Sequence, residues 1–138
     1  MSGGVGQRSS DGLRVVVADD DAAFVQALAL LVNGQPGLTV AGSASNGLEA
    51  IELVEALDPE AVIIDLHMPL LDGVTAIARM RRDNPSLCLI ALTGDDDPEL
   101  HDAVREAGAD AVLLKATFLQ GLLDRLATVR QGQTGARA

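Results

Sequence analysis

The sequence predicts an α/β fold in which a doubly wound parallel sheet carries helices on both faces. Short apolar runs alternate five times with stretches of helical apolar spacing along 138 residues, a length suited to one domain. The third run, Ala61-Val62-Ile63-Ile64, is unbroken and rich in β-branched residues, as expected of a strand buried on both faces. Aromatic residues make up 1% of the chain against 48% apolar residues, so the core has to be aliphatic.

Each predicted strand is followed by a predicted helix. The strands are expected at residues 13–18, 38–44, 61–65, 87–92 and 111–114, with the more polar second one at an edge of the sheet. The helices are expected at about 22–33, 46–58, 74–82, 97–107 and 117–130, with Asp21, Asn46, Asp97 and Thr117 as candidate N-caps. This alternation predicts a flavodoxin-like (βα)5 sheet with strand order 2-1-3-4-5.

The expected folded domain covers residues 13–130. Residues 1–12 are rich in Gly and Ser and are predicted to be a disordered leader, and residues 131–138 are predicted to be a polar tail. There is no internal repeat and no sign of a second domain.

Composition argues against several classes of function. The net charge of −10 and the pI of about 4.4 disfavour direct binding of nucleic acid or an anionic membrane. No apolar stretch reaches the length of about 18 residues that a membrane span requires. Cys88 is the only cysteine, so no disulfide can form within the chain, and a cytoplasmic protein is expected.

Polar side chains stand where four of the predicted strands end. Asp19 and Asp20 follow the first strand, Asp65 ends the third, Thr93 follows the fourth and Lys115 follows the fifth. In the predicted strand order these ends are neighbours, at the edge of the sheet where ligands bind in this kind of fold.

These residue types suit phosphoryl chemistry. Three close carboxylates repel one another unless a cation lies among them, and Mg²⁺ favours carboxylate, carbonyl and water ligands. We therefore expect Mg²⁺, with Asp20 and Asp65 as direct ligands and Asp19 bound directly or through water. An aspartate can also attack a phosphoryl group to form an acyl phosphate, whose charge the Lys115 ammonium and the Thr93 hydroxyl would stabilise.

The motifs VVVADD, IIDLHMPLLDG, LIALTG and GADAVLLK, in this order and spacing, resemble the receiver domains of two-component response regulators across about residues 13–130. The resemblance implies that Asp65 accepts a phosphoryl group from a sensor histidine kinase. It implies that Asp19, Asp20, Asp65 and the backbone carbonyl of His67 hold Mg²⁺, and that Thr93 and Lys115 contact the phosphoryl group. The Leu-Leu-Lys-Ala segment is most similar to receivers of the group with LuxR-type helix-turn-helix output domains.

The same resemblance implies a switch that is not a conventional enzyme. Phosphorylation would shift the surface of the fourth helix, fifth strand and fifth helix, which would then control dimerisation or an output domain acting in transcription. Two positions depart from the family pattern: Val112 replaces a common aromatic residue, and Ala116 replaces the proline that often follows the lysine. We expect a trans bond before Ala116, because a cis bond to a residue other than proline costs roughly 2.5–4 kcal/mol.

Other interpretations remain open at this point. Asp21 fits a helix cap better than a metal ligand, and Asp95-Asp96-Asp97 with His101 fits a solvated helix start better than a second metal site. The side chain of His67 either overhangs the site or lies on the surface. Two alternative functions are a pseudo-receiver that only binds proteins and a haloacid-dehalogenase-like phosphatase. The phosphatase would need a second acid at position 67, where this chain has histidine.

Overall fold

The computed structural model describes residues 12–135, which form a five-stranded parallel sheet in the order β2-β1-β3-β4-β5. The predicted strand order and fold class are therefore confirmed. The strands are β1 Leu13–Ala18, β2 Leu38–Ala44, β3 Ala61–Asp65, β4 Cys88–Thr93 and β5 Ala111–Leu114. The helices are α2 Ala22–Asn33, α3 Gly47–Leu57, α4 Gly73–Asp83, α5 Pro98–Ala107 and α6 Phe118–Gly135.

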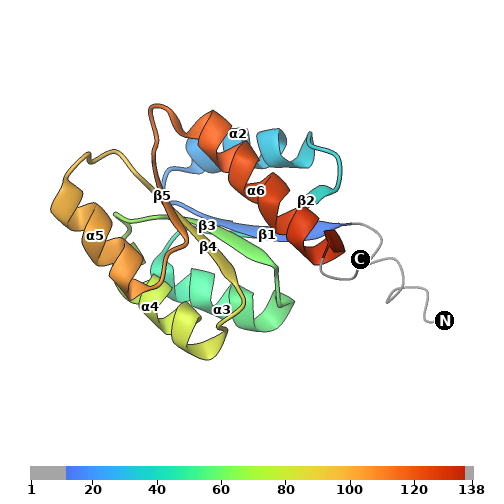
Figure 1. Cartoon of the computed structure of the whole chain (residues 1–138). Helices are drawn as coiled ribbons and strands as arrows, with labels where there is room; N and C mark the ends of the chain where they lie inside the picture. Colours follow the sequence, from blue (N-terminus) through green and yellow to red (C-terminus); the bar gives the residue numbers. More distant parts are fainter. Residues whose placement is uncertain (1–11, 136–138) are drawn as a thin grey trace.

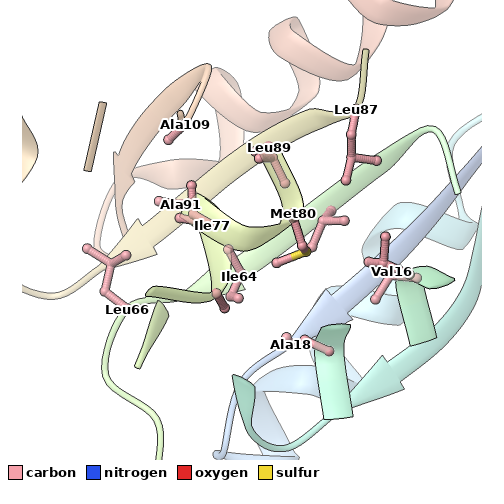
Figure 2. Close-up of a cluster of buried hydrophobic side chains, with 14 of the residues drawn as sticks. Val16, Ala18, Ile64, Leu66, Ile77, Met80, Leu87, Leu89, Ala91 and Ala109 are labelled. Atoms are coloured by element: carbon pink, nitrogen blue, oxygen red, sulfur yellow. The ribbon is translucent and has the colours of Figure 1, made fainter. Parts of the chain in front are cut away.

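The helices form a layer on each side of the sheet. Helices α2 and α6 cover one face, while α3, α4 and α5 cover the other (Figure 1). Side chains of a strand point alternately to the two faces, so Ile63 packs with the α2 and α6 layer and its neighbour Ile64 packs with the opposite layer. Figure 2 shows Ile77 and Met80 of α4 among the side chains of this second cluster, beside Ile64 and Ala91.

Strand register places the carboxyl ends of the strands at one edge. Ala18 of β1 pairs with Ile64 of β3, and Asp65 pairs with Leu92 of β4. Thr93 then pairs with Leu114, the last residue of β5. The residues that follow these pairs must therefore emerge close together.

Short polar residues begin the helices as the sequence predicts. The Asp21 carboxylate accepts hydrogen bonds from the backbone of Ala23 and Phe24, which confirms its role as a cap of α2. Asn46 and Asp97 likewise cap α3 and α5. These caps satisfy backbone N–H groups that the first helical turn leaves without partners.

Two expectations about helices are corrected. The helical spacing of Leu48 with Ile51 and Val54 predicts an inner face that includes Leu48, yet Leu48 is 44% exposed while Ala50 is fully buried. Helix α6 continues to Gly135 instead of ending near residue 130. Gln131 and Gln133 are adequate helix formers, so the backbone continues beyond the last apolar residue at helical spacing.

Three smaller expectations concern single positions. Within residues 12–135 no peptide bond is cis, so the bond before Ala116 is trans as expected. Cys88 is a buried free thiol, and burial raises its pKa to about 11. Of the predicted leader 1–12, residues 1–11 lie outside the described residues, while Gly12 leads directly into β1. In the described part of the chain, no helix has both the length and the apolar character needed to cross a bilayer.

Candidate functional site

Asp19 is fixed at the end of β1 by its own backbone and by the chain that follows it. Its N–H donates to the carbonyl of Ala44 at 3.0 Å, and its Oδ1 accepts the N–H of Asp21 at 2.9 Å. The residue is 2% exposed. A carboxylate has thus been placed in the protein interior with only one of its oxygens engaged by the backbone.

Asp65 ends β3 and is 3% exposed. The loop after it closes tightly, since the N–H of Leu66 donates to Leu92 and the N–H of Gly73 donates to the carbonyl of Leu66, at 3.1 and 3.0 Å. A Cβ on Gly73 would lie 2.5 Å from the carbonyl oxygen of Asp65, so only glycine permits this approach. The loop therefore holds the Asp65 carboxylate at the rim of the sheet.

Lys115, the single lysine of the sequence, reaches both buried acids. Its Nζ lies 2.7 Å from Oδ2 of Asp19 and 3.5 Å from Oδ1 of Asp65. Its backbone N–H donates to the carbonyl of Thr93 at 2.8 Å, which anchors the lysine to the end of β4. The predicted meeting of Asp19, Asp65 and Lys115 at one edge is what the structure contains.

Electrostatics at this edge are unbalanced toward negative charge. Burial, reinforced by the charge of Asp19, raises the pKa of Asp65, although Lys115 and a hydrogen bond from the His67 backbone act in the opposite direction. Burial alone would lower the pKa of Lys115, but its contact with Asp19 and the charge of Asp65 outweigh burial and raise it. The lysine is therefore a permanent cation beside a carboxylate whose ionisation is costly.

The acidic residues fit a divalent cation. One carboxylate oxygen from each of Asp19, Asp20 and Asp65 lies within 4.8 Å of the others, with Asp20 exposed and the other two buried. Among the described residues, the Lys115 ammonium at 2.7 Å is the one hydrogen-bond donor beside Oδ2 of buried Asp19. Three carboxylates and one ammonium leave net negative charge at this edge, which suits a hard cation with oxygen ligands such as Mg²⁺.

Thr93 is fully buried, and its hydroxyl accepts the N–H of Asp95 at 3.0 Å. The carbonyl of Asp95 is in turn 2.8 Å from Nε2 of His101 on α5. Asp97 caps α5, so the acidic run forms a structured helix start. The interpretation of this segment as a helix start is thereby confirmed.

Comparison with known proteins decides the family. The profile described as "Response regulator receiver domain" matches residues 15–127. The chain belongs to this family. Among curated relatives, protein-glutamate methylesterase/protein-glutamine glutaminase 4 of Myxococcus xanthus is 37% identical over 107 residues, which are 77% of this chain and 30% of that protein. The nitrate/nitrite response regulator protein NarL of Escherichia coli is 30% identical over 119 residues, covering 86% of this chain and 55% of that protein.

A solved structure confirms the fold of this receiver. A DNA-binding response regulator of the LuxR family from Staphylococcus aureus has a TM-score of 0.79 at 24% identity, covering 86% of this chain and 98% of that chain. The expected likeness to response-regulator receivers is confirmed by the profile and by the NarL relative, and the LuxR-family structure shares the fold. The chain spans about half or less of the length of the curated relatives described above.

Sequence analysis did not identify the aromatic ring that contacts the site lysine. The ring of Phe24, on α2, has its centroid 4.6 Å from Nζ of Lys115. Phe118, at the start of α6, packs against Phe24 with 5.7 Å between ring centroids and an interplanar angle of 59°. One signal was available: these are the only two aromatic residues of the sequence. His67, by contrast, has an exposed side chain, and its proposed part in the site concerns its backbone.

Proposed function

We propose that this receiver is the phosphoacceptor of a two-component system, and that Asp65 takes a phosphoryl group from the phosphohistidine of a sensor histidine kinase. One observation carries the proposal: the only lysine of the chain lies 3.5 Å from a buried aspartate that ends the central strand. A carboxylate oxygen of Asp65 would attack phosphorus while the phosphorus–nitrogen bond of the donor breaks. The imidazole leaves with the bonding electrons and takes up a proton, and an acyl phosphate remains on the protein.

Asp19, Asp20, Asp65 and the backbone carbonyl of His67 would hold Mg²⁺ at this edge. The bound cation supplies positive charge for the phosphoryl oxygens and offsets the repulsion among the acids. Lys115 would pair with a phosphoryl oxygen, since its ammonium already lies beside the acceptor carboxylate. The buried Thr93 hydroxyl, from the adjacent strand, would donate a hydrogen bond to another phosphoryl oxygen. These groups would act by position and charge.

The outcome we propose is a shift between two arrangements of the surface formed by α5, β5 and α6. Contacts of the phosphoryl group with Thr93 and Lys115 would favour one arrangement by their differential affinity for it. Thr93 connects to α5 through Asp95, and Lys115 connects β5 to α6. Val112 carries no aromatic ring to move with the threonine, so we assign the coupling to the loop and the helices.

Control of transcription through dimerisation or an output domain is proposed from the likeness to NarL and LuxR-family regulators. The methylesterase relative shows that receivers of this kind also occur with other outputs. We propose a cytoplasmic role without direct DNA contact by this chain, given its net charge of −10. The acyl phosphate would be the signal itself, and we do not propose an enzymatic turnover.

The test is intact-mass analysis after incubation with a small phosphodonor and Mg²⁺. One phosphoryl group should add to the wild type and to Asp96→Asn, which removes an exposed acid from the same edge of the molecule. Asp65→Asn should show no addition. A wild type that gains no mass, or an Asp65→Asn variant that still gains it, would contradict the assignment.

Light scattering tests the proposed surface separately. Phosphorylated wild type should show a larger mass than the unmodified chain at equal concentration if α5, β5 and α6 form a dimer interface. A mass unaffected by phosphorylation at every concentration would exclude dimerisation as the output, while leaving the phosphoacceptor assignment to the mass measurement above.

A further inference from the structure

The distribution of aromatic residues in this chain is unusual. Phe24 and Phe118 are its only aromatic residues; Phe24 lies against the site lysine, Phe118 packs on Phe24, and both are at the margin of a core layer. The core layers are otherwise built from aliphatic side chains, the thioethers of Met68 and Met80, and the thiol of Cys88. The aromatic pair therefore has a role beside the Lys115 ammonium that aliphatic side chains would not fulfil.

The backbone fixes both rings. Phe24 stands in the first turn of α2, where its N–H donates to the Asp21 carboxylate at 3.2 Å. Phe118 is the first residue of α6, three positions after Lys115. The rings are half-buried and pack against the apolar layer under α2 and α6. Their tilted contact, with centroids 5.7 Å apart, is the geometry that aromatic pairs favour.

The Phe24 ring completes the surroundings of the ammonium. Nζ of Lys115 has Asp19 at 2.7 Å, Asp65 at 3.5 Å and the ring centroid at 4.6 Å. A lysine side chain has many rotamers, and this one is 29% exposed, so two carboxylates alone leave it free to sample solvent-facing positions. A cation over an aromatic face is attracted to the ring at this distance.

We infer that Phe24 is a positioning residue for phosphoryl acceptance: its ring, supported by Phe118, holds the Lys115 ammonium over the Asp65 carboxylate. The inference rests on the proposed phosphoacceptor function and deepens it. Leucine at position 24 would retain apolar packing but would lose the negatively charged face of the ring. The lysine would then spend less time beside Asp65, and each encounter with a phosphodonor would be less productive.

The experiment compares rates of phosphorylation by phosphoramidate with Mg²⁺ in four proteins. Phe24→Leu should be slower than wild type by roughly fivefold, the effect expected of one cation–ring contact. Phe24→Tyr keeps the ring and should stay near the wild-type rate. Leu31→Ala removes apolar packing from the same helix, away from the lysine, and should also stay near wild type.

A second measurement, by NMR, reports the position of the Lys115 side chain relative to the Phe24 ring. Because the chain has one lysine, its ε-methylene protons give a single identifiable set of NMR signals. The Phe24 ring current should move them upfield in wild type, and Phe24→Leu should abolish that shift while Leu31→Ala keeps it.

The outcomes separate this inference from the function on which it rests. A wild type that accepts no phosphoryl group overturns the proposed function and this inference with it. A wild type that reacts, with Phe24→Leu equally fast, overturns the inference alone. The inference also fails if Phe24→Tyr or Leu31→Ala is as slow as Phe24→Leu, or if the lysine signals of wild type show no ring-current shift.

Discussion

Nζ of Lys115 lies 2.7 Å from Oδ2 of Asp19, and within the described residues no other donor approaches that buried oxygen. The ammonium therefore occupies the place of a counter-ion to an acid that is also a candidate metal ligand. A divalent cation at the acidic cluster and the lysine would compete for the same negative charge. The affinity of the acidic cluster for Mg²⁺ should therefore depend on whether the lysine is present.

We predict that Lys115→Ala binds Mg²⁺ more tightly than the wild type. Removing the ammonium frees Oδ2 of Asp19 and removes a positive charge that repels the metal, so an affinity gain of roughly tenfold is expected, or about 1.4 kcal/mol. Calorimetric titration with MgCl₂ measures it. Arg105→Ala, which removes an exposed cation in the last turn of α5, should leave the affinity near that of wild type. Equal affinities for wild type and Lys115→Ala would show that ammonium and metal do not compete.

A second prediction is that Asp65→Asn stabilises the metal-free protein. The amide is nearly the same size as the carboxylate but removes one of two buried negative charges, leaving Asp19 paired with Lys115. Single stabilising replacements commonly add about 0.5–2 kcal/mol to the free energy of unfolding. Urea unfolding at neutral pH with a chelator present measures the gain. Asp96→Asn, at an exposed acid, should change the stability far less.

The pH dependence of that gain has a definite sign. Burial and the charge of Asp19 raise the pKa of Asp65 in the folded state above its ordinary value of 3.8. The folded protein therefore binds this proton more readily than the unfolded chain, and the penalty for ionised Asp65 grows as pH rises above the ordinary pKa and is complete above the folded-state pKa. The advantage of Asp65→Asn should be largest at neutral pH and shrink as pH falls. An advantage that grows toward acid pH would contradict the assignment of the penalty to Asp65.

The strands and the main acids of the site were predictable because each rests on a local signal. An unbroken apolar run such as 61–64 is buried on both faces, and parallel strands have to end at a common edge, so Asp65 and Lys115 were placed by topology alone. Caps were equally accessible, since Asp21 and Asp97 stand immediately before helical spacing begins.

Other contacts were beyond the sequence because they depend on packing between distant segments. Nothing in the periodicity of α2 distinguishes Phe24 from a core residue, and its meeting with Lys115 depends on how α2 and α6 tilt on the sheet. Which of Ala50 and Leu48 is buried likewise depends on how α3 docks against the chain around Leu71, which approaches Gly47 too closely for a Cβ. Spacing along one helix carries no information about such contacts.

Arg81 of α4 is a further element that the sequence did not reveal, and it yields a stability prediction. Its guanidinium donates to the carbonyl oxygens of Pro85, Leu87 and Gly108 and pairs with Asp110 at 2.8 Å. The Arg81 guanidinium thus links α4 to the turns that precede β4 and β5. Because several carbonyls would lose their donor together, Arg81→Ala should lower the free energy of unfolding by about 2–3 kcal/mol.

A matched pair of variants checks the role of Arg81. Arg81→Lys keeps the charge but cannot supply donors in a fork, so it should recover only part of the loss. Arg82→Ala alters the neighbouring exposed arginine, whose ion pair is with adjacent Asp83, and should cost little. Urea unfolding measures all three. If Arg81→Ala and Arg82→Ala lose similar stability, the network contributes no more than a surface pair.

The last prediction is that glycine at position 70 stabilises the protein, because the backbone conformation and the exposed side chain of Leu70 both favour this replacement. It has a φ of 69° in the loop between β3 and α4, where the N–H of Leu71 donates to the carbonyl of Pro69 at 2.8 Å. A left-handed conformation costs a residue with a Cβ about 1–2 kcal/mol, and the Leu70 side chain is 78% exposed, so little packing offsets that cost. Leu70→Gly should therefore raise the free energy of unfolding by about 1 kcal/mol.

Leu30 is the control for this prediction, since it is also an exposed leucine, at 75%, but lies within helix α2. Glycine inside a helix is less favourable than other residues by about 1 kcal/mol, so Leu30→Gly should destabilise the protein. The two variants make the same chemical change with opposite expected signs in one urea-unfolding experiment. If both lower the stability, the left-handed backbone at position 70 is not the source of strain, and the exposed Leu70 side chain makes contacts that stabilise the loop.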